Sequence, residues 1–599
     1  MKARRMNQAA RGWLLGLLVM VCAPALGGLV PPQDGLVPDR AAEAIVEQLK
    51  AGRMGDAVER VQTLLADESA KLIKQDSRLL PVTTWVDLQL ASTNTRDAFI
   101  AEYEKSLGAI ARRDLEVGRR SGSLVEVMRI AARYPWTLAS MNAPLDAVKL
   151  ALDTGDISTA AALDPTAKQI DGIPQDRVLP PASFSSEWYQ AFLPVLTGRI
   201  VPVAATDFVV VASPVSVVAM NGQGRLLWST GPAPASKPLL AASDKRQAVE
   251  YTDESLSRPV VWCDLGGTPR VVAARYTDGG GSSLRAYRAS DGKQVWDTAA
   301  LSDSKDWVVI GSPATSGGMV FSIVAKLDAA SGARLMIVAF DLVGGNVLWK
   351  SEIGEMVPAT HHHGAKRDDR FRGASVVLDR FDGTSAVLSV DRRSVYAVMT
   401  GWCVAVDRFS GQVRWLASYP LNVMDEKQMA REKKQKVPSL FRRWRDEAVS
   451  DGTTVVVAPT DSDAVVAFDA ATGVQQWKSD GLRGHEMIGL SGDRVLFAGA
   501  SISALKISTG ESIWQNALPD TRFTGPCVID GDFLGVITDR GPAYFSIERG
   551  LTVQRRDPGV VSLDALLRQP ATRNALQTAD LLRYFQPGTP TGSKTERQK

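Results

Sequence analysis

The chain has 599 residues, more than one ordinary domain holds, so two or more folded units are expected. Its content of 45% hydrophobic and 23% charged residues is globular and excludes a chain that is disordered or fibrous throughout. The formal net charge of +3 is close to neutral for this length, which argues against nucleic acid as a partner.

The N-terminus has the three parts of a secretory signal peptide. Residues 1–11 are basic, Trp13–Val21 form a short apolar run, and an A-x-A-like ending follows at Ala25. We predict a signal peptide over 1–27 and a periplasmic or secreted protein, with no transmembrane segment after cleavage because no later stretch is long and apolar enough. Lipidation at Cys22 is the second alternative, since Val21 is a poor match for the small residue that normally precedes a lipidated cysteine.

Residues 38–165 have helical spacing of apolar residues. In AAEAIVEQLKAGRMGDAVERVQTLLADE this spacing continues on both sides of Gly52, and in LDAVKLALDTGDISTAAALD a second pair of segments is separated by Gly155-Asp156, where Asp156 can cap the second helix. Helix–Gly–helix hairpins with small residues such as Ala57 and Ala160 resemble tetratricopeptide (TPR) repeats. The sequence therefore predicts an all-α, TPR-like domain.

The composition changes twice after the helical region. Residues 166–199 contain several prolines and little periodicity, which predicts a linker. Residues 200–556 consist of short Val-, Ala- and Ile-rich runs bounded by Gly, Asp and Ser, as in a strand-rich domain. The C-terminal tail, 557–599, has two short helical patterns and an end that should be disordered.

A Gly-x-x-x-Trp motif repeats through the strand-rich region. It predicts a glycine turn followed by an outer strand whose tryptophan packs between neighbouring four-stranded units. A seventh, degenerate copy has Gly550 but Gln554 in the tryptophan position, and an eighth could lie in 230–285. The six complete copies are Gly224/Trp228, Gly292/Trp296, Gly345/Trp349, Gly411/Trp415, Gly473/Trp477 and Gly510/Trp514.

An acidic residue begins three of these turns. Asp341, Asp407 and Asp469 stand four residues before the glycine, where a carboxylate can accept hydrogen bonds from the turn amides.

The units VVAFDAATGVQQW, IVAFDLVGGNVLW and CVAVDRFSGQVRW resemble the PQQ-type (quinoprotein) β-propeller repeat. The resemblance covers residues 200–556 and implies an all-β propeller of seven or eight blades behind the helical hairpins. This order of parts is similar to a group of secreted bacterial proteins often labelled BamB-like. The chain departs from the BamB type in its long helical region and in its signal peptide, which does not match a lipoprotein signal.

The resemblance also raises the question of a quinone cofactor. PQQ-dependent dehydrogenases need calcium held by acidic and amide side chains, an aspartate base and a tryptophan below the cofactor, and many have two adjacent cysteines. The chain has no Cys-Cys pair, and no calcium ligand or base can be assigned by motif. We therefore expect no enzyme activity and no catalytic, cofactor-binding or metal-binding residue, with PQQ and calcium as the alternative.

The remaining chemistry-bearing residues have structural interpretations. Cys263, Cys403 and Cys527 lie in apolar runs and are expected to be buried strand cysteines, although a disulfide between two of them stays open. His361–His363 are expected on a solvated loop, with a metal site left open. His485 has no acidic-ligand context.

Two further segments invite a functional interpretation. The charge-rich run 425–447 is interpreted as a solvated excursion rather than a membrane or nucleic-acid site, because acidic residues dilute it. DGGGSS at 278–283 lacks the Gly-Lys of a phosphate loop and is expected to be a hairpin turn.

We therefore predict an exported, non-catalytic scaffold that binds a protein or an envelope polymer through propeller loops and the helical groove, plausibly in cell-envelope assembly. The long connections 355–372 and 421–447 are the candidate binding loops. The alternatives are a PQQ- or metal-dependent oxidoreductase and a polysaccharide-binding module. The sequence leaves the partner and the oligomeric state open.

Overall fold

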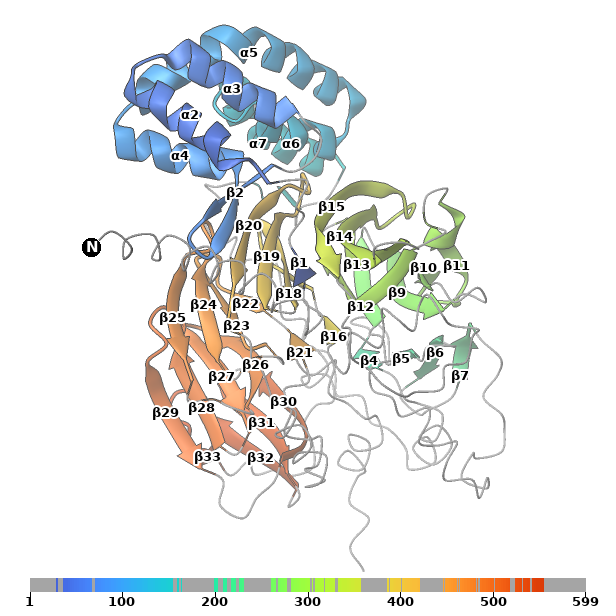
Figure 1. The fold of residues 1–599 in the computed structure, drawn as a ribbon. Coiled ribbons are helices and arrows are strands. Elements are labelled where there is room, and N and C mark those ends of the chain that lie inside the picture. Colours follow the sequence, from blue (N-terminus) through green and yellow to red (C-terminus); the bar gives the residue numbers. More distant parts are fainter. Residues whose placement is uncertain are drawn as a thin grey trace, which may run out of the picture.

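The computed structural model describes an N-terminal helical part and a C-terminal part made of strands (Figure 1). The predicted signal peptide, nearly all of the predicted linker and the predicted C-terminal tail lie outside the described residues. The described residues are 29–30, 36–66, 71–154, 159–160, 163, 199–202, 208–212, 217–221, 226–230, 260–265, 268–276, 282–301, 304, 307–316, 318–328, 332–356, 385–386, 388–399, 401–420, 445–446, 448–459, 462, 464–480, 482, 485–499, 501–517, 523–530, 532–538 and 541–553.

The helical part contains six helices in its described residues and confirms the predicted N-terminal helical region. Its first turn follows the sequence pattern, because Gly52 adopts a left-handed φ of 73° between α2 and α3. Ala57 and Ala160 are both buried, as expected of small residues at helix contacts. The helices are α2 (Asp39–Lys50), α3 (Met54–Ala66), α4 (Val82–Thr93), α5 (Arg96–Ser121), α6 (Leu124–Arg133) and α7 (Leu138–Asp153).

An aromatic cluster joins the first helices to the last ones. The Trp136 ring, between α6 and α7, meets the α5 rings of Phe99 and Tyr103 edge-on, at centroid distances of 5.3 and 5.1 Å. Its indole N–H donates to Asp87 of α4 at 3.0 Å. The side chains of Ser123 and Thr137 accept hydrogen bonds from the first turns of α6 and α7 and so cap both helices. The helices therefore form one packed layer.

A β-hairpin interrupts the helical region, which the sequence pattern did not predict. Strands β2 (Leu72–Gln75) and β3 (Arg78–Pro81) lie between α3 and α4 and pair antiparallel. The helical pattern on either side hid these two strands of four residues each. The predicted second helix after Gly155-Asp156 falls largely outside the described residues.

Seven sheets in the described residues contain four consecutive antiparallel strands, which confirms the predicted propeller of seven or eight blades. The strands β8 and β9 pair with β10 and β11, so the described part of 230–285 belongs to the Trp296 sheet rather than to an eighth one. Two of the seven sheets have additional strands, β1 on β15 and the β3–β2 hairpin on β20. A further parallel pair joins β16 to β21.

The sheets follow one another in chain order and contact their neighbours. Contacts run from β4 to β8, from β8 to β12, from β12 to β17, from β18 to β22, from β22 to β26 and from β26 to β30. The strands are β1 (Leu29–Val30), β4 (Arg199–Pro202), β5 (Phe208–Ala212), β6 (Val217–Asn221), β7 (Leu226–Ser229), β8 (Val260–Leu265), β9 (Thr268–Tyr276), β10 (Ser282–Arg288), β11 (Gln294–Asp297), β12 (Trp307–Ser316), β13 (Met319–Asp328), β14 (Gly332–Asp341), β15 (Val347–Met356), β16 (Ser385–Ala386), β17 (Ser389–Val390), β18 (Ser394–Met399), β19 (Trp402–Asp407), β20 (Val413–Ser418), β21 (Arg445–Asp446), β22 (Ala448–Ser450), β23 (Thr454–Val457), β24 (Val465–Asp469), β25 (Gln475–Ser479), β26 (Glu486–Ser491), β27 (Arg494–Ala498), β28 (Ser501–Lys506), β29 (Ser512–Ala517), β30 (Phe523–Asp530), β31 (Phe533–Thr538), β32 (Gly541–Ser546) and β33 (Thr552–Val553).

Each repeat tryptophan fastens its own sheet to the next one, as the repeat predicted. The indole N–H donates to the carbonyl of the residue that follows the third strand of the next sheet, and the ring covers that sheet's turn. The six hydrogen bonds are Trp228 to Ala289 (2.7 Å), Trp296 to Leu342 (2.9 Å), Trp349 to Arg408 (3.0 Å), Trp415 to Ala470 (3.0 Å), Trp477 to Ile507 (2.7 Å) and Trp514 to Ile547 (2.9 Å).

The acidic turn residues act as predicted. Asp407 accepts hydrogen bonds from the amides of Phe409 and Ser410 at 3.1 and 2.8 Å. Asp341 and Asp469 accept equivalent bonds from the amides two and three residues after them. The acidic side chain therefore closes the turn by binding the two amides that precede the glycine.

Candidate functional site

The helical layer is joined to the strand-rich part by shared β-structure. Strand β3 pairs antiparallel with β20, with Leu79 opposite Leu416 and Arg78 opposite Ala417. The Arg78 guanidinium donates to the carbonyl of Thr472, in the turn of the following sheet, at 3.0 Å. In Figure 1 the hairpin of β2 and β3 lies between the helices and β20, and β3 is the strand that pairs with β20. The β2–β3 hairpin is therefore part of the β20 sheet, and it holds the helical layer beside the outer edge of that sheet.

A hollow of about 250 Å³ lies at this junction. Its lining combines apolar residues with polar ones, among which are Thr83, Thr84, Ser410, Gln412 and Arg414. The Asp407 carboxylate in the wall accepts three hydrogen bonds from its own turn, from the amides of Phe409 and Ser410 and from the Ser410 hydroxyl. These three bonds all end on one oxygen of the carboxylate, which closes the turn beside the hollow.

His485 is buried beside Ser501. Its side chain is 6% exposed, and its Nε2 accepts a hydrogen bond from the Ser501 amide at 3.3 Å and lies 2.9 Å from the Ser501 hydroxyl. The Gln515 amide donates to the same hydroxyl at 3.0 Å. His485 directly precedes β26, so these contacts join the start of β26 to the start of β28.

Cys403 is the strand cysteine whose side chain lies in the described part of the chain. Cys403 in β19 is fully buried and free, and burial raises the pKa of its thiol. Such a thiol is inert at neutral pH. Cys263 and Cys527 belong to β8 and β30, and their side chains lie outside the described residues.

Most of the predicted binding loops also lie outside the described part. This applies to His361–His363 and to most of 355–372 and 421–447, of which 355–356 belong to β15 and 445–446 to β21. DGGGSS connects the antiparallel strands β9 and β10, as expected of a hairpin. In the ranges that the structure describes, no group of three His, Cys, Asp or Glu side chains is placed to hold a metal.

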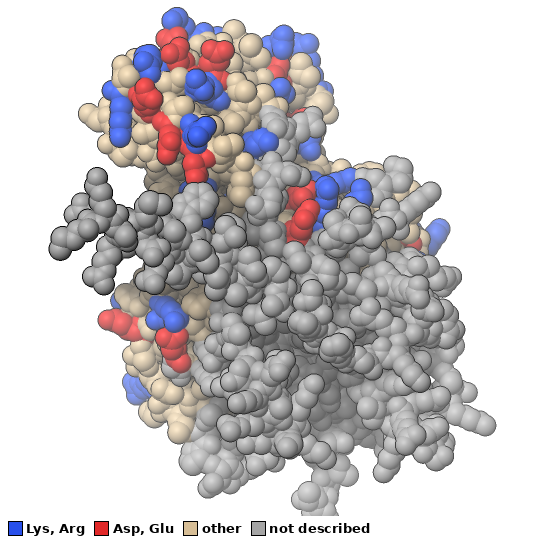
Figure 2. Space-filling view, viewed as in Figure 1, with Lys and Arg blue, Asp and Glu red and all other residues tan. Residues whose placement is uncertain are grey.

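Charge is mixed over the helical layer. On the face shown in Figure 2, Lys and Arg side chains alternate with Asp and Glu over the helices. Many of them form exposed ion pairs, such as Arg96 with Asp87 and Lys105 with Glu102. None of the described helices is long and apolar enough to cross a membrane.

The repeated turns and docked tryptophans can now be compared with known families. Residues 333–559 match the family described as outer membrane protein assembly factor BamB. The chain carries a PQQ-like β-propeller. The matched part of this PQQ-like propeller runs from β14 to the last strand, β33.

Several solved structures are similar to the chain. BamB from Moraxella catarrhalis is 18% identical, with a TM-score of 0.36, and the match covers 60% of this chain and 87% of that chain. A europium-containing methanol dehydrogenase is 15% identical, with a TM-score of 0.28 and coverages of 56% and 81%. Hsv2p of Kluyveromyces lactis is 11% identical, with a TM-score of 0.32 and coverages of 59% and 96%. No curated protein matches the chain.

Proposed function

We propose that the chain is an exported, non-enzymatic scaffold that binds a protein partner during cell-envelope assembly. The match of residues 333–559 to the BamB family carries this proposal, since that family is described as an outer membrane assembly factor. The proposal also includes an envelope polymer as the alternative partner. It further includes TPR-like helices and a signal peptide over 1–27.

The rigid junction of the two parts supports a scaffold role. Strand β3 completes the β20 sheet, and Arg129 of α6 donates to the Leu348 carbonyl of β15 at 3.1 Å. Helices and propeller thus present their surfaces at a fixed relative position, which lowers the entropy cost of binding a partner to both.

The test uses the full chain in its source organism. A photo-cross-linking amino acid is placed at single positions in 355–372 and 421–447, and at exposed Val117 of α5 as a comparison. We expect adducts with one envelope protein from the loop positions. If no position gave an adduct with an envelope component, the scaffold function would be overturned.

A second measurement distinguishes the scaffold from the alternative function, a PQQ-dependent oxidoreductase. The purified chain is incubated with PQQ and calcium, and a bound chromophore and dye reduction with alcohols and sugars are monitored. We expect no turnover. A stoichiometric quinone spectrum with turnover would instead identify a PQQ-dependent oxidoreductase.

A further inference from the structure

Helix α7 has a heptad-spaced apolar stripe, of which four residues are exposed to solvent. Leu138, Met141, Leu145 and Leu152 keep 57, 57, 52 and 54% of their surface exposed. Val148 is partly buried and continues the same series. The five residues follow each other at intervals of three, four, three and four, which places them within an arc of about 80° on the helix.

The opposite face of α7 is packed with small residues. Ala139, Ala143, Ala147 and Ala151 are at most 2% exposed and face the core. The helix therefore buries its alanines and exposes its leucines, the reverse of a surface helix that has only the core as a partner. Single exposed apolar residues are ordinary, but a heptad-spaced row of them indicates a second contact face.

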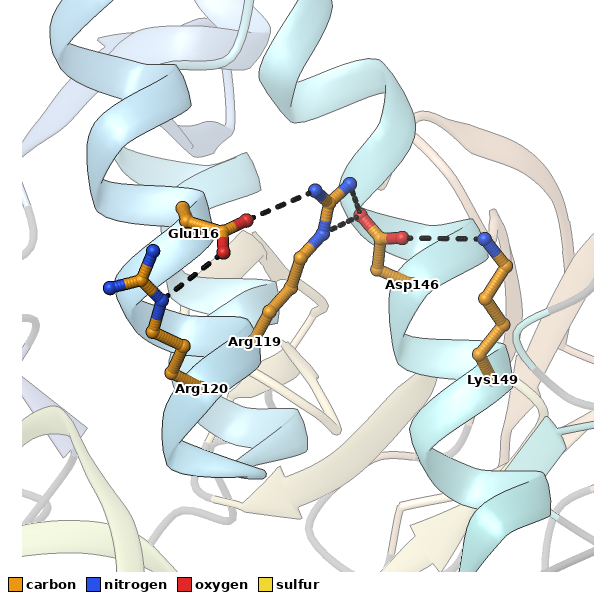
Figure 3. A network of polar contacts seen from close by, with 5 residues as sticks. All are labelled: Glu116, Arg119, Arg120, Asp146 and Lys149. Carbon is orange, nitrogen blue, oxygen red and sulfur yellow. Dashed lines mark hydrogen bonds and ion pairs between the residues drawn. The ribbon is translucent and has the colours of Figure 1, made fainter.

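The stripe is bordered by an ion network between α5 and α7 (Figure 3). Asp146 of α7 accepts from Arg119 through two guanidinium nitrogens and lies 3.7 Å from Lys149. Glu116 pairs with Arg120 at 3.2 Å and with Arg119 at 3.5 Å. This network fixes α7 against α5.

The end of that network on α7 is cationic and exposed. The side chain of Lys149 is 75% exposed, whereas that of Asp146 is 10% exposed. Lys149 follows Leu145 by one helical turn and so borders the stripe directly. A partner that covers the leucines would therefore gain from carboxylates on its flank.

The dimensions fit a single helix. Residues 138–152 span about 21 Å along the axis, and an arc of about 80° on a helix of about 10 Å diameter is about 7 Å wide, which one helix covers. A stable dimer of whole chains buries roughly 800 Å² on each partner, several times this surface. The stripe matches two heptads of one partner helix better than a second copy of the chain.

We propose that α7 is a docking site for one amphipathic helix of a partner protein, which has apolar residues at heptad spacing and an acidic residue next to Lys149. The inference rests on the proposed scaffold function in one respect: the docking site would be one of the contacts that the scaffold makes with its partner.

A synthetic probe tests this directly. The probe is a fluorescein-labelled peptide of three heptads with Leu at positions a and d and Glu at e and g, where like charges suppress self-pairing. Its binding to the full chain is measured by fluorescence anisotropy at low salt, next to a peptide with Lys at e and g. We expect the Glu peptide to bind at least tenfold tighter than the Lys peptide.

Two variants locate the binding on α7. Leu145→Glu should weaken binding of the Glu peptide at least tenfold, and Lys149→Glu should reduce or reverse the preference between the two peptides. Val117→Glu is the matched control. Val117 is 62% exposed on α5 but lies about 200° around that helix from Arg119, which contacts α7, so binding should not change. Thermal unfolding midpoints check that all variants are folded.

Several results would overturn the docking site. Equal binding of the two peptides, or binding that Leu145→Glu leaves unchanged, would do so. A dimer in sedimentation that Leu145→Glu abolishes would assign the stripe to a second copy, and co-flotation with phosphatidylglycerol vesicles that the same variant abolishes would assign it to lipid. The loop cross-links described above test the scaffold function by themselves, so the two failures can be told apart.

Discussion

Gly473 of one propeller sheet lies against the indole of Trp415 in the preceding sheet. A Cβ added at Gly473 would lie 2.7 Å from Trp415 Cδ2, and the residue also has a φ of 67°. The same contact recurs for the turn glycine of every described turn onto which a tryptophan docks. The glycine therefore serves two purposes, the left-handed turn and the close approach of the ring.

Gly473→Ala should destabilise the chain by more than the backbone alone accounts for. A left-handed non-glycine residue costs on the order of 1–3 kcal/mol, and displacement of the Trp415 ring adds to this. Gly492→Ala is the control, because Gly492 has a φ of 58° but nothing within 4 Å of the added Cβ. Equal losses in urea unfolding would show that the ring contact has no energetic role.

Trp415→Phe should destabilise the propeller by about 2–3 kcal/mol. The Trp415 side chain is fully buried, and its loss as a donor leaves the Ala470 carbonyl unpaired. Trp514→Phe removes the equivalent bond to Ile547 where the ring is only partly buried, so a smaller loss is expected. Urea unfolding followed by circular dichroism measures both, and a larger loss at Trp514 would contradict the burial argument.

Arg78→Ala should loosen the junction of helices and propeller. The Arg78 side chain is 11% exposed and donates to the Thr472 carbonyl, a charged hydrogen bond worth about 1.5–3 kcal/mol. Hydrogen exchange should become faster in peptides that cover β3 and β20. Arg96→Ala breaks an ion pair between two side chains that are about half exposed, and exchange there should change little. Unchanged exchange at β3 would show that strand pairing alone holds the junction.

Asp451 should give the propeller a pH-dependent stability. Its partial burial raises the pKa of the carboxyl, but hydrogen bonds from the Thr454 and Thr453 amides and the Thr453 hydroxyl outweigh this and lower it. A lowered pKa means that the stabilisation is present above the unfolded-state pKa and is lost as the pH falls through the folded-state value. The melting midpoint of Asp451→Asn should therefore lie below that of the parent chain at pH 7. The difference should shrink below about pH 4, whereas a constant difference would exclude this linkage.

The sequence predicted the propeller because its signal is local. Glycine, acid and tryptophan fall within one turn and one strand, as in Asp469, Gly473 and Trp477, so each copy can be read by itself. What each tryptophan contacts is not local. Trp415 meets Gly473 only because the next sheet stacks on it, and the glycine's second role follows from that neighbour.

The junction and the α7 stripe were missed for related reasons. Strand β3 has four residues, and its partner β20 begins at Val413, far beyond the reach of periodicity. In α7 the pattern indicated a helix, but it did not tell which apolar row faces the core. The structure assigns that face to small residues such as Ala143 and leaves Leu145 outside.

The pairing of Leu79 with Leu416 also sets an order of folding events. The two residues are 416 − 79 = 337 positions apart in the chain. At a synthesis rate of about 5–20 residues per second, roughly 20 to 70 s pass between the appearance of the first and that of the second. During that time the outer edge of β3 has no strand beside it, and an unpaired edge invites association with other chains. The nascent hairpin therefore needs shielding until residue 418 has emerged.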